Sequence, residues 1–360
     1  MKRLGALALA ALLLAGCRKP AEIQTAPAAA AAEWTEAAPE TTVTEETVPA
    51  AEAQPERFLL TFAGDCTLGS NANNYFAGQG FIKTVGEDYG YPFRNVADYF
   101  TGDDFTMVNL EGPLCDEGNP VQKKHTFHGP TVYTEILTQG SVEAVTIANN
   151  HMLDYGEKGY ASTLDALDGA GIPYVERDSS RLIRTDSGLT IGLYGMVYYK
   201  LDVEDMLSEI RDLRQQGAEI VIVAPHWGTE HAYRPTEEQV RVGHAAIDGG
   251  ADIVFGSHPH VLQPIEYYGD GVIYYSLGNF SFGGNGNPSD YDTALLQQEV
   301  IRWPDGRVEL GELTRIPACV SSVSGRNNFQ PIPLPQGSGE YERVLSKLDG
   351  SFTGPNLEIH

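Results

Sequence analysis

Two histidines separated by a single proline follow an apolar run in the C-terminal half of the chain. The run is ADIVF at residues 251–255, and GSHPH at 256–260 comes directly after it. His226 closes a similar run, AEIVIVAPH at residues 218–226. Imidazole nitrogens are ligands for Zn²⁺, Mn²⁺ and Fe ions in proteins. The chain has only nine histidines, so three at strand ends indicate either packed core residues or metal ligands.

Carboxylate and amide side chains occupy equivalent places earlier in the chain. Asp65 closes RFLLTFAGD, Glu111 closes DFTMVNLE, and Asn150 closes VEAVTIANN. Ligand sites of α/β sheets form beyond the carboxyl ends of the strands, so we expect these side chains on one side of a predicted α/β sheet. The sequence therefore predicts a site for one or two divalent ions (Mn, Zn or Fe), held by Asp65, Glu111, Asn150, His226, His258 and His260.

Alternating apolar runs and amphipathic segments predict the elements that position these residues. Strands are expected where the runs above stand, and helices over 156–171, 202–217 and 236–250. Met206, Ile210 and Leu213 recur at helical spacing, and Thr236 precedes its helix as an N-cap. Hairpins are expected over 181–197, with an Asp-Ser-Gly turn, and over 294–317, with a Pro-Asp-Gly turn.

The composition of the first 56 residues predicts that they are not part of a folded domain. Residues 1–17, MKRLGALALAALLLAGC, carry two early cations and a short apolar stretch that ends at Cys17. This stretch resembles the lipobox of bacterial lipoproteins, in which the cysteine is lipidated and begins the mature chain. Residues 18–56 are rich in Ala, Pro, Thr and Glu without apolar periodicity, which predicts a disordered tether. We therefore expect an extracytoplasmic protein, anchored to the cell membrane through a lipid on Cys17.

The overall charge limits the class of partner. A formal net charge of −25 argues against a nucleic-acid binder, because such proteins meet phosphates with a basic surface. An anionic ligand remains compatible with the chain, since a bound metal can invert the local field.

Six ordered blocks between residues 58 and 285 resemble the signature blocks of the bacterial capsule-synthesis CapA family, whose poly-γ-glutamate members include PgsA. That family belongs to the calcineurin-like metallophosphoesterase superfamily. The blocks are FAGDCTLG (62–69), VNLEGPL (108–114), ANNHMLDYG (148–156), HWGTEHAYRPTEEQ (226–239), GSHPHVLQPIEYY (256–268) and YYSLGNFSF (274–282). The resemblance implies a four-layer αββα sandwich over 57–320, followed by a C-terminal extension at 321–360.

The resemblance also implies roles for single residues. Asp65 and His260 would bind a first ion, Glu111 would bridge, and Asn150, His226 and His258 would bind a second ion. His151 matches the histidine that stays off the metal and donates a proton to a leaving group, with Asp154 orienting its imidazole. One position departs from the superfamily pattern: Thr67 stands where the phosphoesterases place a histidine, two residues after the first aspartate.

Four neighbours are candidates for substrate binding. Lys124 and His128, in KKHTFHGP at 123–130, would pair with an anionic polymer or belong to a solvated edge strand. Glu230 is interpreted as a ligand-orienting group, a general base or a loop carboxylate, and Asn279 as a site residue or a turn former. Among the remaining thiols, Cys66 and Cys115 could form a disulfide, Cys66 could bind metal, or each could be a buried free thiol.

Two functions follow from these expectations. One is a metal-dependent hydrolase or transferase acting on an anionic envelope polymer such as poly-γ-glutamate. The other is a non-catalytic, polymer-binding accessory of a membrane-embedded capsule synthase, whose subunits would be other chains.

Overall fold

The computed structural model describes residues 54–72, 80–199 and 202–357. The predicted signal sequence, Cys17 and residues 18–53 of the predicted tether lie outside the described residues. Among the helices of the described part, none is both long enough and apolar enough to cross a membrane.

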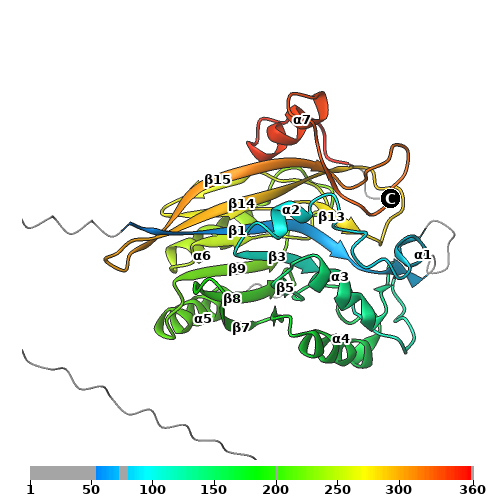
Figure 1. Ribbon diagram of the computed structural model, residues 1–360, viewed down its shortest axis with the longest axis horizontal. Coiled ribbons are helices and arrows are strands. Elements are labelled where there is room, and N and C mark those ends of the chain that lie inside the picture. Colours follow the sequence, from blue (N-terminus) through cyan, green and yellow to red (C-terminus); the bar gives the residue numbers. More distant parts are fainter. Residues whose placement is uncertain (1–53, 73–79, 200–201, 358–360) are drawn as a thin grey trace, which may run out of the picture. The chain divides into compact units, whose positions relative to one another are not determined.

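Two β-sheets form the body of the protein (Figure 1). The first sheet has the order β16-β15-β14-β1-β3-β5-β6, and β13 pairs with β1. Its strands are β1 (Glu56–Thr67), β3 (Phe105–Leu110), β5 (Ala144–Thr146), β6 (Tyr174–Val175), β13 (Asn279–Phe282), β14 (Asp292–Arg302), β15 (Val308–Cys319) and β16 (Ile332–Pro333). Strands β1, β3, β5 and β6 run parallel to one another.

The second sheet has the order β11-β12-β10-β9-β8-β7. Its strands are β7 (Ser179–Arg184), β8 (Thr190–Val197), β9 (Ile220–His226), β10 (Ile253–Phe255), β11 (Ile265–Tyr268) and β12 (Gly271–Tyr274). The central strands β8, β9, β10 and β12 are parallel. A separate small sheet pairs β2 (Ser70–Asn71) with β4 (Phe127–His128).

Helices cover the outer faces of both sheets. The first sheet packs against α1 (Phe81–Val85), α2 (Ala97–Phe100), the 3-10 turn η2 (Thr131–Tyr133), α3 (Thr134–Gln139) and α4 (Gly156–Ala170). The second packs against α5 (Val203–Gln215) and α6 (Glu237–Asp248). The predicted helices are confirmed, and Thr236 caps α6 in a reciprocal capping box with Gln239.

The side chains of each central strand alternate between the core that separates the two sheets and the core under the helices, which explains the layered arrangement. On β9, Ile220, Ile222 and Ala224 enter the core between the two sheets, whereas Val221 and Val223 meet the helices. Successive side chains of a strand point to opposite faces, so a strand covered on both sides is apolar throughout. The four-layer αββα arrangement implied by the sequence resemblance is therefore confirmed, as are the two predicted hairpins, β7–β8 and β14–β15.

The GSHPH segment leaves the second sheet directly after β10, as the sequence predicts. β10 ends at Phe255, and residues 256–260 form a loop. Within this loop His258 has φ 98° and His260 has φ 57°. These left-handed conformations are incompatible with a continuing strand and are uncommon for residues other than glycine.

The C-terminal segment belongs to the same body. β16 extends the first sheet, and α7 (Gly339–Leu348) lies beside β15 (Figure 1). Lys347 of α7 is buried, and its Nζ lies 2.6 Å from Asp290 Oδ2 and 2.8 Å from Asp292 Oδ2. Arg343 forms a two-pronged pair with Asp292 at 2.7 Å for each contact. The Lys347 ammonium also lies 4.6 Å from the ring centre of Tyr233. A buried charge network therefore joins α7 to the body of the protein.

Replacing Lys347 with methionine is expected to lower the free energy of unfolding by about 3–5 kcal/mol, because the change leaves two buried carboxylates without their ammonium. Urea unfolding would measure the loss. Lys158→Met, at an exposed position of α4, is the matched control and should stay within about 0.5 kcal/mol of the wild type. A loss below about 1 kcal/mol for Lys347→Met, the size typical of an exposed ion pair, would contradict the network's importance.

Candidate metal centre

The six predicted ligand residues come together, but from two sheets. Asp65, Glu111 and Asn150 stand at the ends of β1, β3 and β5 in the first sheet. His226 ends β9, and the two histidines of the 256–260 loop follow β10, in the second sheet. The expectation that all six close a single sheet is therefore wrong: the carboxylates and the amide face the imidazoles across the junction of the two sheets.

A buried pair of carboxylates forms one half of the site. Asp65 and Glu111 are each 1% exposed. Asn109 donates from Nδ2 to Asp65 Oδ1 at 2.9 Å and to Glu111 Oε2 at 3.4 Å. Asn149 in turn donates to Asn109 Oδ1 at 3.2 Å. Sequence reasoning missed Asn109, although its position on the same strand face as Glu111, two residues earlier, was an available signal.

Imidazoles and an amide oxygen form the other half. His226 Nε2 lies 3.0 Å from Asn150 Oδ1 and 3.1 Å from His258 Nδ1. His226 Nδ1 is held by Ser257 Oγ at 2.9 Å. Burial lowers the pKa of His226 well below its usual value and lowers that of His258 to about 3. Both rings are therefore neutral near pH 7, which is the form of imidazole that binds a metal.

The two halves meet at His260. Its Nδ1 lies 3.2 Å from Asp65 Oδ2 and 3.0 Å from Asn279 Oδ1, and its Nε2 lies 3.7 Å from Glu111 Oε1. Burial opposes a charge on His260, but Glu111 and Asp65 raise its pKa to about 10. Burial raises the pKa of Glu111 to about 8, opposed by His260 and assisted by Asp65.

The arrangement fits a bound divalent cation. Glu111 Oε1 is buried and has no hydrogen-bond partner, and a buried carboxylate oxygen without one is costly. Ligand atoms of Asp65, Glu111 and His226 lie within 4.8 Å of one another, and so do those of Glu230, His258 and His260. Imidazole, carboxylate and amide donors suit Mn²⁺, Zn²⁺ or Fe. A cation between these groups would satisfy the free oxygen and the facing imidazole lone pairs together.

His151 lies beside the candidate ligand residues. Its Nδ1 lies 2.6 Å from Asp154 Oδ2, and its Nε2 lies 3.7 Å from Glu111 Oε1. Asp154 is 1% exposed and also accepts the backbone N–H of Phe127 at 2.7 Å. The Phe127 ring stacks on the imidazole at 4.2 Å between centroids. Burial lowers the pKa of His151, although Asp154 acts to raise it.

A cavity of about 560 Å³ opens over these residues. Three of the four predicted substrate-binding residues line it, namely Lys124, Glu230 and Asn279. His128 does not belong to the lining: its ring packs 4.1 Å from that of Tyr155, and its Nδ1 lies 3.4 Å from the carbonyl oxygen of Cys115.

The three described thiols are free. A disulfide between Cys66 and Cys115 is therefore not formed. Cys66 is buried, its Sγ contacts the carbonyl oxygen of Gly64 at 3.6 Å, and burial raises its pKa. Cys66 is also absent from both groups of ligand atoms, which leaves a buried free thiol.

The protein is thus a two-sheet sandwich in which side chains that could hold a metal ion cluster where the parallel strands end. Comparison with protein families matches residues 59–284 to the bacterial capsule synthesis protein family PGA_cap. The chain belongs to this family.

Two relatives of this chain are named for capsule or PGA biosynthesis. The capsule biosynthesis protein CapA of Bacillus anthracis is 28% identical over 284 residues, covering 71% of this chain and 66% of that protein. The PGA biosynthesis protein CapA of Bacillus subtilis is 31% identical over 278 residues, covering 70% and 72% respectively. Among solved structures, the NAD nucleotidase of Haemophilus influenzae aligns with a TM-score of 0.43 and 12% identity, over 83% of this chain and 63% of that one.

If the cluster binds metal, His258→Ala should lower both the metal content of the purified protein and its melting temperature in Mn²⁺ or Zn²⁺. A ligand present at 100 times its dissociation constant stabilises the folded state by about 2.7 kcal/mol, and that gain shrinks when affinity falls. Elemental analysis and thermal melts, with and without chelator, measure the two effects.

The matched control is His244→Ala, on α6, where the imidazole contacts Glu266 away from the ligand groups. It should retain metal content and the metal-dependent rise in melting temperature. A wild-type protein that carries no metal and melts at the same temperature with or without Mn²⁺ and Zn²⁺ would contradict the metal centre.

Proposed function

We propose that this chain is a metal-dependent hydrolase or transferase acting on an amide-linked or phosphorylated envelope polymer, foremost poly-γ-glutamate. The observation that carries the proposal is the placement of His151. One ring nitrogen is fixed by a buried carboxylate, and the other faces the ligand cluster from the edge of an open cavity. Membership in a capsule synthesis family supports the choice of polymer.

The ion would be held by the six residues predicted from the sequence: Asp65, Glu111, Asn150, His226, His258 and His260. A bound divalent ion supplies a polarised carbonyl or phosphoryl oxygen and a water of lowered pKa. The histidine rings need no deprotonation before binding where burial already keeps them neutral, as at His226 and His258.

His151 would move the proton. Asp154 accepts a hydrogen bond from the Nδ1–H of His151 and so fixes the orientation of the ring. Nε2 is then the ring atom that would exchange a proton with substrate. Lys123 Nζ lies 3.1 Å from Asp154 Oδ1 and 2.9 Å from the carbonyl oxygen of Asn150. The lysine therefore joins the segment before β4 to the loop that carries Asn150, His151 and Asp154.

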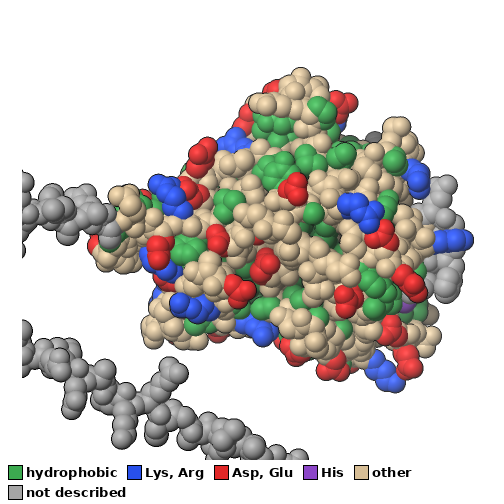
Figure 2. Space-filling model, viewed as in Figure 1, with side chains coloured by type: hydrophobic (Ala, Val, Ile, Leu, Met, Phe, Trp, Pro, Cys, Tyr) green, Lys and Arg blue, Asp and Glu red, His purple; other side chains and the backbone are tan. Residues whose placement is uncertain are grey.

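The cavity wall has the charge that an anionic polymer needs. Lys123, Lys124 and His125 line it on the segment before β4. Figure 2 shows acidic side chains spread over the face drawn, with lysines and arginines between them. A local cationic wall on a protein of net charge −25 would direct the carboxylates of a polyanion to the cavity.

One observation favours the second candidate function, a non-catalytic, polymer-binding accessory of a membrane-embedded synthase. Thr67 replaces the histidine of the phosphoesterases, and its buried hydroxyl has no hydrogen-bond partner. An altered ligand set is compatible with binding nascent polymer without cleaving it. A polymer-binding assay beside a cleavage assay separates the two functions.

His151→Ala should lower turnover by roughly 10²- to 10⁴-fold, the usual contribution of a general acid or base, while metal content stays unchanged. Poly-γ-glutamate chain length and release from an aryl phosphoester are the two readouts. His244→Ala serves again as the matched control.

Full turnover by His151→Ala would exclude the proton-transfer role. A wild type that binds the polymer, carries metal and cleaves neither substrate would favour the accessory function.

We further propose that the protein is extracytoplasmic and held at the cell membrane by a lipid on Cys17. The support is the sequence of residues 1–17, in which two cations precede a short apolar stretch that ends at the cysteine. Two acyl chains anchor a protein stably, whereas one alone binds a membrane only marginally.

Cys17→Ser should move the protein from the membrane fraction to the soluble fraction, because it removes the thiol that carries the lipid. Detergent-free fractionation and immunoblotting measure the distribution, with Cys319→Ser as a control that keeps the anchor. Unchanged membrane retention of Cys17→Ser would rule out the lipid anchor.

A further inference from the structure

The carboxylate half of the metal centre lacks a donor at one position. Thr67 follows Asp65 by two residues, is 1% exposed, and has a buried hydroxyl without a hydrogen-bond partner. A neutral hydroxyl is a weak ligand compared with a carboxylate or an imidazole. From the predicted ligands alone, this half has three donors, from Asp65, Glu111 and His260, which leaves room for a further ligand at an ion of octahedral preference such as Mn²⁺.

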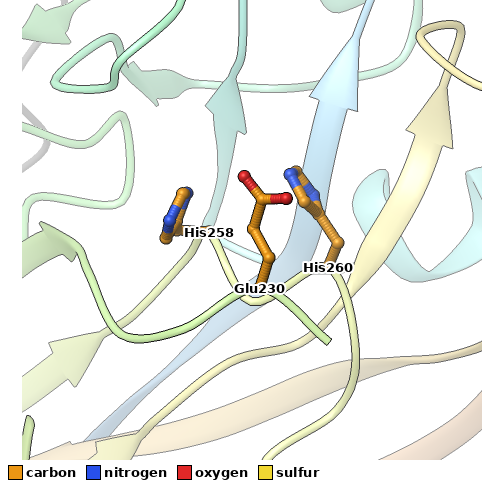
Figure 3. A group of neighbouring side chains, drawn as sticks. All are labelled: Glu230, His258 and His260. Atoms are coloured by element: carbon orange, nitrogen blue, oxygen red, sulfur yellow. The ribbon is translucent and has the colours of Figure 1, made fainter. Parts of the chain in front are cut away.

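Glu230 points its carboxylate between His258 and His260 (Figure 3). One ligand atom from each of these three residues lies within 4.8 Å of the others. Among the described residues, the Glu230 carboxylate has no hydrogen bond or ion pair. A carboxylate that faces two imidazoles from the wall of a cavity, without a partner of its own, is placed as a metal ligand would be.

The loop that carries Glu230 is anchored rather than free. The backbone N–H of His231 donates to the carbonyl oxygen of Pro259 at 2.8 Å, which joins this loop to the one carrying both histidines. Gln263, fully buried, donates to the carbonyl oxygen of Ala232 at 2.8 Å. Gln263 is itself held by the buried Gln239 at 2.8 Å. Anchoring of this kind lowers the entropy cost of ordering the side chain around an ion.

His260 links Glu230 to the carboxylate half, because its Nδ1 lies 3.2 Å from Asp65 Oδ2 and it shares a ligand group with Glu230. The negative charge of Glu230 acts on Glu111 and His260, in each case raising the pKa of the group, after larger contributions from burial and nearer charges. With Glu230 included, this side offers three carboxylates and one imidazole. The other side offers two imidazoles and one amide oxygen. Oxygen donors favour Mn²⁺ and Mg²⁺, and imidazoles favour Zn²⁺ and Fe.

We propose that Glu230 is a further ligand of the metal centre, which would compensate for the weak donor at Thr67 and make the Asp65 half an oxygen-rich site selective for Mn²⁺ over Zn²⁺. The inference rests on the proposed metal-dependent function and names the ligand set of one half of that site.

Metal titration of four full-length proteins tests the assignment: the wild type, Glu230→Gln, Glu230→Gln with Thr67→His, and the control Glu237→Gln. Glu237 is an exposed carboxylate in the first turn of α6. Each protein is stripped with chelator and titrated calorimetrically with Mn²⁺ alone and with Zn²⁺ alone. Apparent melting temperatures are recorded with and without metal.

Glu230→Gln should weaken one Mn²⁺ site by at least roughly 10- to 100-fold, since loss of even an outer-shell partner costs that much. Zn²⁺ affinity at the other site should change little. The metal-free melting temperature should stay equal or rise, because one negative charge leaves a crowded acidic cluster. Thr67→His should restore part of the lost affinity and shift that site toward Zn²⁺. Glu237→Gln should behave as the wild type.

Mn²⁺ affinities within about twofold of the wild type for Glu230→Gln would overturn the assignment while leaving the metal centre intact. A wild type that binds no metal would overturn the assignment together with the proposed function. A fall in the metal-free melting temperature with no change in affinity would show a structural role for Glu230 instead. If Thr67→His does not fold, the comparison of Glu230→Gln with Glu237→Gln decides alone.

Discussion

Burying the carboxylates of Asp65 and Glu111 where the two sheets meet costs free energy, and the groups around them must offset that cost. Asp65 and Glu111 are almost fully removed from water, and one Glu111 oxygen has no hydrogen-bond partner. Burial of an ionised carboxylate is tolerated only when it is paired with a cation or protonated. His260 offers one positive charge to two carboxylates. A divalent cation is the partner that matches both the remaining charge and the facing neutral imidazoles.

The fold holds the carboxylates and the imidazoles close together by packing the two sheets firmly against each other. Phe62 of β1 packs 5.2 Å from Phe255 of β10 and 5.5 Å from Tyr274 of β12, ring centre to ring centre. These contacts lie a few residues from Asp65 on one sheet and from the 256–260 loop on the other, so the apolar layer fixes the distance between the two ligand halves. The left-handed conformations of His258 and His260 add local strain, which a surrounding structure retains where it serves a site.

Local pattern was enough to predict the helices and which polar residues come together at the candidate metal centre. Helices α4, α5 and α6 follow from apolar spacing and the Thr236 cap, and the candidate ligands follow from polar residues at the ends of apolar runs. What local pattern could not predict depends on long-range contacts. Nothing near Asn109 in the sequence shows that it spaces Asp65 from Glu111. The approach of the Glu230 loop to the histidines depends on pairing across residues 231 and 259, and periodicity carries no signal for that.

The cavity wall and the side chains that hold His151 share one segment of the chain. Residues 123–125 line the cationic wall of the cavity, and two residues further on Phe127 donates its backbone N–H to Asp154 and stacks its ring on His151. Lys123 connects the same wall to the same carboxylate through its ammonium group. A polymer that displaces this segment would therefore also move the carboxylate that holds the His151 imidazole. Under the proposed hydrolase or transferase function, the same connection would align His151 once substrate is seated.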